Sequence, residues 1–368
     1  MKLKTFLIVG CLGGLFTLSS CTAPTNVKDY SAYVNPFIGT GGHGHTFPGA
    51  VVPHGMIQPS PDTRIDGWDA CSGYYYADST INGFSHTHVS GTGCCDYGDV
   101  LLMPTVGKQQ YRTTDPQSQR LAYASSFSHK NEIAEPGYYS VFLDTYQVKA
   151  EISSTKRGAI HRYTFPENAE SGFIIDLDYS LQRQTNSEME IEVISDTEIC
   201  GHKKTTYWAF DQYINFYAKF SKPFSYTLVT DSITMDNGKR LPVCKALLHF
   251  NTSKDEQVLV KVGVSAVDIA GARKNVESEI PGWDFEKVRK DARTAWNEYL
   301  SKIDITTSDK EDKTIFYTAL YHTAISPNLF TDADGRYLGM DLEVHQGDTI
   351  NPLYTVCLLY TSDAADEL

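Results

Sequence analysis

The sequence predicts a mainly β fold, in which a large antiparallel β-sandwich is followed by a helical region. Short runs rich in β-branched and aromatic residues recur from Tyr30 to about Ala266, with turn formers and no helical period between them. After Ile280-Pro281-Gly282 the apolar residues recur instead at steps of three and four, as on a helix. The chain has 368 residues and 41% hydrophobic residues, enough for two domains and a sizeable core.

The expected strands fill residues 30–266, which we interpret as one β-sandwich domain. Turn formers such as Glu135-Pro136-Gly137 and Asp236-Asn237-Gly238 separate them. The expected strands are Val100 to Met103, Tyr138 to Leu143, Val148 to Ile152, Ala159 to Phe165, Gly172 to Leu177, Met189 to Ile194, Tyr213 to Phe220, Ser225 to Val229, Ala246 to Phe250 and Gln257 to Val264.

Residues 267–283 read as a linker, and two helices are expected after it. The first has an apolar face from Phe285 to Ile303, and Asp284 is placed to cap it. The second is predicted to begin at a capping box, Ser308-x-x-Glu311, and to end before Pro327. Asp334-Gly335 predicts a tight turn within an extended segment. Residues 284–356 therefore look like the start of a helical domain.

Both ends of the chain are expected to lie outside these domains. Residues 1–20 place two lysines before an apolar run, which is typical of a signal peptide and too short for a stable membrane span. Leu18-Ser19-Ser20-Cys21 resembles a bacterial lipobox, which implies lipidation of Cys21, a tether over residues 21–29 and a cell-envelope lipoprotein. The alternative is an ordinary signal peptide with a chance cysteine. Residues 357–368 continue no pattern and are interpreted as an aberrant tail, with a natural solvated tail as the alternative.

The net charge limits the classes of binding partner, and the cysteines raise the question of disulfide bonds. A net charge of −13 disfavours nucleic acid and an anionic membrane surface, while a neutral sugar would be indifferent to it. The 23 tyrosines suit sugar stacking and equally suit a large β core. Export would place the remaining cysteines in an oxidising compartment. A bridge from Cys94 or Cys95 to Cys71 and buried free thiols are both open.

The stretch from Asn35 to Pro104 is rich in glycine, proline, histidine and aromatic residues, and it predicts a wall of ordered loops. Its two H-x-H pairs, His43/His45 and His86/His88, allow three interpretations: hydrogen bonds to loop backbone, hydrogen bonds to a substrate, or a transition-metal site. The glycines from Gly39 to Gly44 lack the Lys-Ser/Thr ending and the βαβ context of a nucleotide site, which we exclude.

Asp66-Gly67-Trp68-Asp69 is the most suggestive feature of this stretch. A tryptophan between glycine and aspartates is expected at the surface, where a pyranose ring stacks on it. The alternative is packing on the edge of the sandwich. Asp96 and Asp99 either serve acid–base chemistry or cap turns. G-x-S-x-G is absent, so no serine nucleophile is indicated.

Several long blocks carry a resemblance to a known family. They are YVNPFIGTGGHGHTFPGAVVPHGMIQPSPDTR, GWDACSGYYY, GFSHTHVSGTGCCDYGDVLLMP, EPGYYSVFLDTYQVKAEISSTKRGAIHRYTFP and YTALYHTAISPNLFTDADGRYLGMD. In their order they resemble glycoside hydrolase family 92, whose members are exported bacterial exo-acting α-mannosidases that need calcium. The resemblance implies a β-sandwich N-terminal domain followed by the first helices of an (α/α)6 barrel, incomplete in this chain. It also implies an inverting mechanism with two carboxyl groups.

The resemblance places the family's general acid, general base and calcium ligands beyond the end of this chain. No catalytic or metal-binding residue is therefore assigned, and the chain alone is expected to be inactive. Trp68 matches the tryptophan that the family's N-terminal domain sets against the sugar on the leaving-group side. Asp69, His86 and His88 are assigned to the same substrate-binding rim. The expected partners are mannose-containing glycans and, through the lipid anchor, a membrane; a carbohydrate-binding lipoprotein without catalysis is the alternative.

Overall fold

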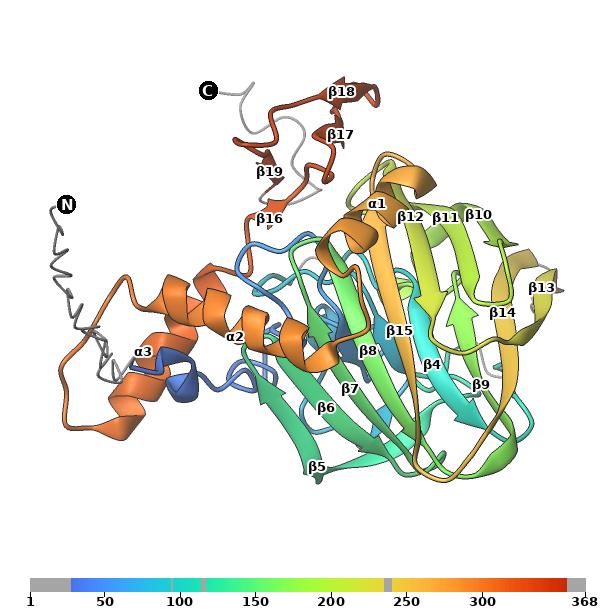
Figure 1. Cartoon of the computed structure of the whole chain (residues 1–368), viewed down its shortest axis with the longest axis horizontal. Coiled ribbons are helices and arrows are strands. Elements are labelled where there is room, and N and C mark those ends of the chain that lie inside the picture. The colour runs from blue at the N-terminus through green and yellow to red at the C-terminus, as the bar shows by residue number, and fades with distance from the viewer. Residues whose placement is uncertain (1–27, 94, 114–116, 235–239, 356–368) are drawn as a thin grey trace, which may run out of the picture.

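A computed structural model of the chain describes residues 28–93, 95–113, 117–234 and 240–355 (Figure 1). The expected leader, the tether with Cys21 and the expected tail lie outside the described residues. None of the helices in the described ranges is long and apolar enough to cross a membrane.

Two antiparallel sheets pack face to face and form the sandwich (Figure 1). One has the strand order β10-β11-β12-β15-β8-β7-β6-β5-β2, and the other has the order β1-β3-β4-β9-β14-β13. The strands are β1 (Ser60–Asp62), β2 (Thr80–Ile81), β3 (Gly83–Ser85), β4 (Leu101–Val106), β5 (Ser125–Glu135), β6 (Tyr138–Leu143), β7 (Val148–Ser154), β8 (Gly158–Phe165), β9 (Asn168–Asp176), β10 (Thr185–Val193), β11 (Glu198–Thr206), β12 (Gln212–Phe220), β13 (Ser225–Thr234), β14 (Arg240–Thr252) and β15 (Glu256–Ser265).

The sandwich confirms the predicted mainly β class, and each predicted strand overlaps an observed one. The core between the sheets comes from alternating apolar positions, for example Val258, Val260 and Val262 of β15, which are buried. The sequence does not predict β1, β2 and β3, which are only two or three residues long. It also does not predict β5 and β11, because their sequences SSFSHKNEIAE and EICGHKKTT carry too few apolar residues to show the alternation.

A helix, α1 (Ile269–Glu279), occupies the expected linker, so the helical part begins earlier than predicted. Asp268 caps it by accepting a hydrogen bond from the Gly271 amide. Ala272 and Val276 are buried against β15, where a Cβ at Gly263 would lie 2.1 Å from the Ala272 carbonyl oxygen. The helix was missed because IAGARKNVESE carries only a narrow apolar stripe.

The two predicted helices are present as α2 (Phe285–Leu300) and α3 (Lys310–Thr323). Asp284 caps α2 through the Lys287 amide, as predicted. The predicted capping box of α3 is wrong, because the cap is Asp309, whose carboxylate accepts from the Glu311 amide. α2 lies against β7 and is fixed by Trp296, whose Nε1 donates to the Val51 carbonyl over 2.6 Å.

After α3 the chain forms two short antiparallel pairs beyond the end of the sandwich (Figure 1). They are β16 (Asn328–Leu329) with β19 (Tyr354–Thr355), and β17 (Arg336–Leu338) with β18 (Val344–Gln346). The predicted turn is confirmed at Gly335, whose φ is +87°. Buried Asp332 fixes this segment to the sandwich by accepting hydrogen bonds from Ser265 and Asn275.

Candidate functional site

Three loop segments contact one another: residues 39–46, residues 66–73, and residues 86–93 with 95–99. The Gly91 amide donates to the His45 carbonyl over 2.7 Å, which joins the first segment to the third. A disulfide between Cys71 and Cys95 joins the second to the third, so one of the alternatives left open for the cysteines is correct. Elsewhere in the described chain, Cys200 and Cys244 are buried free thiols. We call this assembly the loop wall.

Trp68 stands at the surface of the loop wall. It begins a single 3-10 turn, Trp68–Ala70, and its side chain is 61% exposed. The indole rests on Gly93, where a Cβ would lie 2.1 Å from Cη2. The His45 ring meets it edge-on, with ring centroids 4.8 Å apart. The indole is thus supported from below and open to solvent, which supports a stacking platform over packing on the sandwich edge.

The backbone under Trp68 is held by contacts from outside the loop. Gln182 makes two hydrogen bonds to Gly67, since its Nε2 donates to the carbonyl over 2.8 Å and its Oε1 accepts from the amide over 3.3 Å. Asp66 pairs with Arg183 and with Gln119. Gln182 and Arg183 were missed in the sequence, because no local motif connects them to a loop more than a hundred residues earlier.

Asp69 follows Trp68 in the 3-10 turn and is partly exposed. Its carboxylate contacts His43 Nδ1 over 2.6 Å, and the side chains are 30% and 75% exposed, respectively. Both can therefore exchange this contact for hydrogen bonds to a hydroxylated ligand. His43 was noticed only as half of an H-x-H pair.

His86 is fully buried and cannot be a rim residue. Its Nδ1 donates to the Val100 carbonyl over 2.7 Å, so its Nε2 is left to accept from His161 Nε2 at 3.0 Å. His161 Nδ1 in turn accepts from the Tyr163 hydroxyl at 2.9 Å. Burial lowers the pKa of His86 to about 4, which agrees with this neutral chain.

His88 is also enclosed, so its expected place on the rim is wrong. Its Nδ1 donates to the Gln58 carbonyl over 2.7 Å, and its Nε2 contacts Asp62 at 2.7 Å. Gly73 of the Trp68 segment lies directly on this pair, since a Cβ there would be 2.0 Å from Asp62 Oδ1. His86 and His88 thus satisfy backbone and order the loops, which is the first of the three interpretations.

The four imidazoles of the H-x-H pairs do not converge on a metal. Within the described ranges no three His, Cys, Asp or Glu side chains group as metal ligands would. The ring nitrogens of His86 and His88 are all engaged with protein atoms.

Asp96 and Asp99 are buried and act in structural contacts. Asp99 pairs with Lys203 at 2.9 Å and accepts a hydrogen bond from Gln212. Asp96 accepts from the Ala209 amide over 3.1 Å, which caps the turn between β11 and β12. Burial, with a smaller effect of Asp99, raises the pKa of Asp96 to about 7. Turn capping is therefore the interpretation that the geometry supports.

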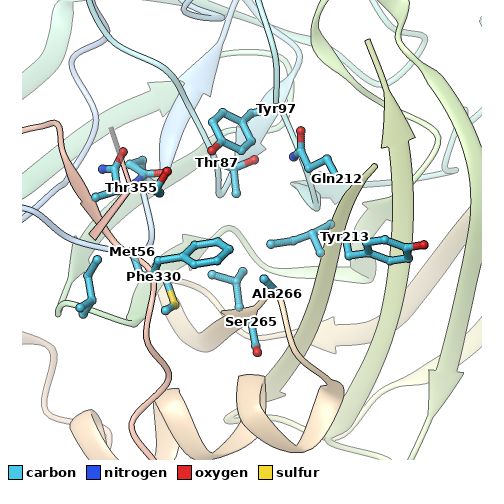
Figure 2. A pocket seen from close by; sticks show the side chains of 14 residues that line it. Met56, Thr87, Tyr97, Gln212, Tyr213, Ser265, Ala266, Phe330 and Thr355 are labelled. Carbon is cyan, nitrogen blue, oxygen red and sulfur yellow. The ribbon is translucent and has the colours of Figure 1, made fainter. Parts of the chain in front are cut away.

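A cavity of about 40 Å³ lies between the loop wall and the part of the chain that follows α3 (Figure 2). Thr87, Tyr97 and Gln212 line its polar side, and Met56 and Phe330 lie on its apolar side. The Gln212 Oε1 atom is buried there without a protein partner. A space of this size suits one or two water molecules and is too small for a sugar ring.

Among its described residues the loop wall therefore presents an open tryptophan beside the Asp69–His43 pair. The buried His86, His88, Asp96 and Asp99 stabilise the loops through contacts with protein atoms. A rigid aromatic platform with adjustable polar neighbours is the kind of surface that carbohydrate-active proteins present to a sugar. Fold and site together define a carbohydrate-active protein built from a β-sandwich and a following helical segment.

Comparisons with known proteins give the family. The Glycosyl hydrolase family 92 N-terminal domain matches residues 33–265, and the Glycosyl hydrolase family 92 catalytic domain matches residues 271–360. The chain belongs to glycosyl hydrolase family 92, as the resemblance implied.

Solved structures agree. A family 92 α-mannosidase from Bacteroides thetaiotaomicron is similar with a TM-score of 0.82 and 35% identity, over 89% of this chain and 45% of that one. The same relative has also been solved with mannoimidazole, again with a TM-score of 0.82. A family 92 inverting mannosidase from the same species has a TM-score of 0.75 and 27% identity, over 90% of this chain and 44% of that one.

A curated relative from the fungus Arthroderma benhamiae, described as an uncharacterized secreted glycosidase, is 29% identical over 92% of this chain. The chain spans about half the length of these relatives. Its own activity and substrate are matters for proposal.

Proposed function

We propose that this protein is part of an exo-acting α-mannosidase that releases mannose from glycans. Trp68 would be the stacking platform for the sugar on the leaving-group side. The observation that carries the proposal is the exposed indole of Trp68 in a chain of this family. The loop that holds it is fixed by the Cys71–Cys95 disulfide and by the hydrogen bonds of Gln182. Asp69 and His43 would hydrogen-bond sugar hydroxyls beside it. An inverting course is proposed because one family relative is named as inverting.

Calcium is proposed for the complete enzyme, where it would polarise and orient sugar hydroxyls. The described residues do not fit a calcium site, since no three acidic or imidazole side chains gather among them. We assign no step of the reaction to the ion in this part of the protein.

The general acid and base are also proposed to lie outside the described residues. Inversion needs two carboxyl groups that face one sugar with room for a water between them. Two carboxyl groups have raised pKa values here: Asp96 in the loop wall and Asp332 in the part of the chain after α3. Both are buried and hydrogen-bonded to protein atoms. The role proposed for the described residues is therefore to bind the sugar.

For localisation we propose a lipoprotein of the cell envelope, anchored through Cys21. Mass spectrometry of the protein from a bacterial membrane fraction tests this directly. A diacylglyceryl-modified Cys21 at the mature N-terminus supports it, and an unmodified N-terminus elsewhere contradicts it.

A chimaera tests the enzymatic proposal. Residues 22–355 are joined to the remaining catalytic domain of the Bacteroides relative, and mannose release from α-mannosides is measured with calcium and after chelation. We expect calcium-dependent release that falls about tenfold in kcat/KM with Trp68→Ala, since stacking on an aromatic ring contributes about 1 kcal/mol or slightly more. A folded chimaera without release would contradict the proposal.

The second candidate is a carbohydrate-binding surface protein without catalysis. It is favoured by one observation: Trp68 is exposed, while the carboxyl groups of Asp96 and Asp332 are buried and hydrogen-bonded to protein atoms. Binding of methyl α-mannoside to this chain in calorimetry, together with a folded but inactive chimaera, would support it.

A further inference from the structure

The turn between β11 and β12 displays three aromatic side chains to solvent. Tyr207, Trp208 and Phe210 are 46%, 55% and 78% exposed. Exposed aromatic clusters of this kind mark binding sites more often than isolated apolar residues do. Trp208 and Trp68 are the two tryptophans with more than half of their surface open to solvent.

The turn is held in one conformation. The buried Asp96 carboxylate accepts from the Ala209 amide over 3.1 Å. The Tyr207 amide donates to the Ala209 carbonyl over 3.0 Å, and the Thr206 hydroxyl donates to the Phe210 carbonyl over 2.7 Å. A ligand would therefore meet rings whose backbone is already ordered, which lowers the entropic cost of binding.

The aromatic turn and Trp68 share one support. Trp68 lies on Gly93, Cys95 is bonded to Cys71 of the Trp68 segment, and Asp96 holds the aromatic turn. Gly93 and Asp96 are three residues apart, so their Cα atoms are separated by about 10 Å at most. Both aromatic surfaces thus stand on the same short piece of the loop wall.

The surroundings of the turn favour a neutral ligand. Asp211, which follows Phe210, is neutralised by Lys204 at 2.7 Å. The Lys204 ammonium also lies over the Tyr213 ring, 4.8 Å from its centroid, so it interacts with both Asp211 and Tyr213 of the same chain. Aromatic rings flanked by this paired aspartate and lysine suit the apolar faces of sugars better than an ionic partner.

We propose that Tyr207, Trp208 and Phe210 form a second sugar-binding platform, and that a mannose-containing oligosaccharide spans it and Trp68. The inference rests on the proposed function and deepens it, because it makes the preferred ligand an oligosaccharide. A monosaccharide occupies Trp68 alone, while a longer glycan gains the second contact.

Calorimetry on this chain tests the inference with two probes, methyl α-mannoside and an α-mannopentaose. The variants are Trp68→Ala, the pair Trp208→Ala/Phe210→Ala, and Tyr226→Ala as a matched control, since Tyr226 is 51% exposed on β13. We expect Trp208→Ala/Phe210→Ala to weaken pentaose binding about fivefold to tenfold and to leave methyl α-mannoside binding unchanged. Trp68→Ala weakens both, and Tyr226→Ala weakens neither.

The outcomes separate this inference from the proposed function. If both probes bind through Trp68 and the double variant binds the pentaose as tightly as the wild type, the second platform is refuted and the proposed function stands. If neither probe binds to the wild-type chain, both are refuted. Because the exchanged side chains are exposed, circular dichroism and the urea midpoint of the variants should match the wild type.

Discussion

The contact between Trp68 and Gly93 offers a perturbation that moves the platform without removing it. A Cβ at residue 93 would lie 2.1 Å from Cη2, 2.5 Å from Cζ3 and 2.8 Å from Cζ2 of the indole, which real atoms do not tolerate. The backbone of Gly93 does not need a positive φ, so Gly93→Ala should be relieved by rotation of the exposed indole. The change in the free energy of unfolding should stay within about 0.5 kcal/mol.

Displacement of the indole should cost sugar affinity. The lost stacking is worth about 1 kcal/mol, which corresponds to a roughly fivefold weaker Kd for methyl α-mannoside. Calorimetry gives the affinity, and urea unfolding followed by circular dichroism gives the stability. Gly41→Ala is the matched control, since a Cβ at residue 41 of the same wall meets nothing within 4 Å. An unchanged Kd for Gly93→Ala, or an equal loss for Gly41→Ala, would refute the role given to Trp68.

Three further perturbations test the support of the loop wall and the packing of α2. Burial raises the pKa of Asp96 from its ordinary 3.8 to about 7, so between about pH 4 and pH 7 the native state keeps a proton that the unfolded chain has lost. The free energy of unfolding of the wild type should therefore fall as the pH rises through this range. Urea titrations should show Asp96→Asn gaining stability relative to the wild type across the same range, and a difference that does not change with pH would contradict this. The Cys71–Cys95 bridge closes a loop with a sequence separation of 24, so Cys71→Ser/Cys95→Ser should lose about 3 kcal/mol in urea unfolding, and a loss no larger than that of Cys200→Ser would contradict a bracing role. Trp296→Phe should lower the free energy of unfolding by about 2–4 kcal/mol in thermal melts, because it leaves the Val51 carbonyl without its donor and a void beside Tyr321. Trp208→Phe at the exposed turn is the control and should be nearly neutral.

The sequence predicted the sandwich because its core strands carry runs of β-branched residues, and it predicted α2 because a capping aspartate precedes a clear apolar face. It failed at β11 and α1, where the polar residues outnumber the apolar ones and burial depends on distant partners. The site shows the same division. The exposure of Trp68 could be predicted from its glycine and aspartate neighbours. The burial of His86 and His88 depends on His161 and Asp62, which no local pattern connects to them.

The central claim is that Trp68 is the surface on which a sugar is bound, and its indole N–H reports on this directly. The chain has 4 tryptophans, and proton–nitrogen NMR resolves one indole signal for each. Trp296, whose Nε1 donates to Val51 in the core, is an internal control. Titration with methyl α-mannoside should shift the signal that is missing in Trp68→Phe, saturably and without moving that of Trp296. A Trp68 signal that stays in place while the sugar binds would contradict the claim.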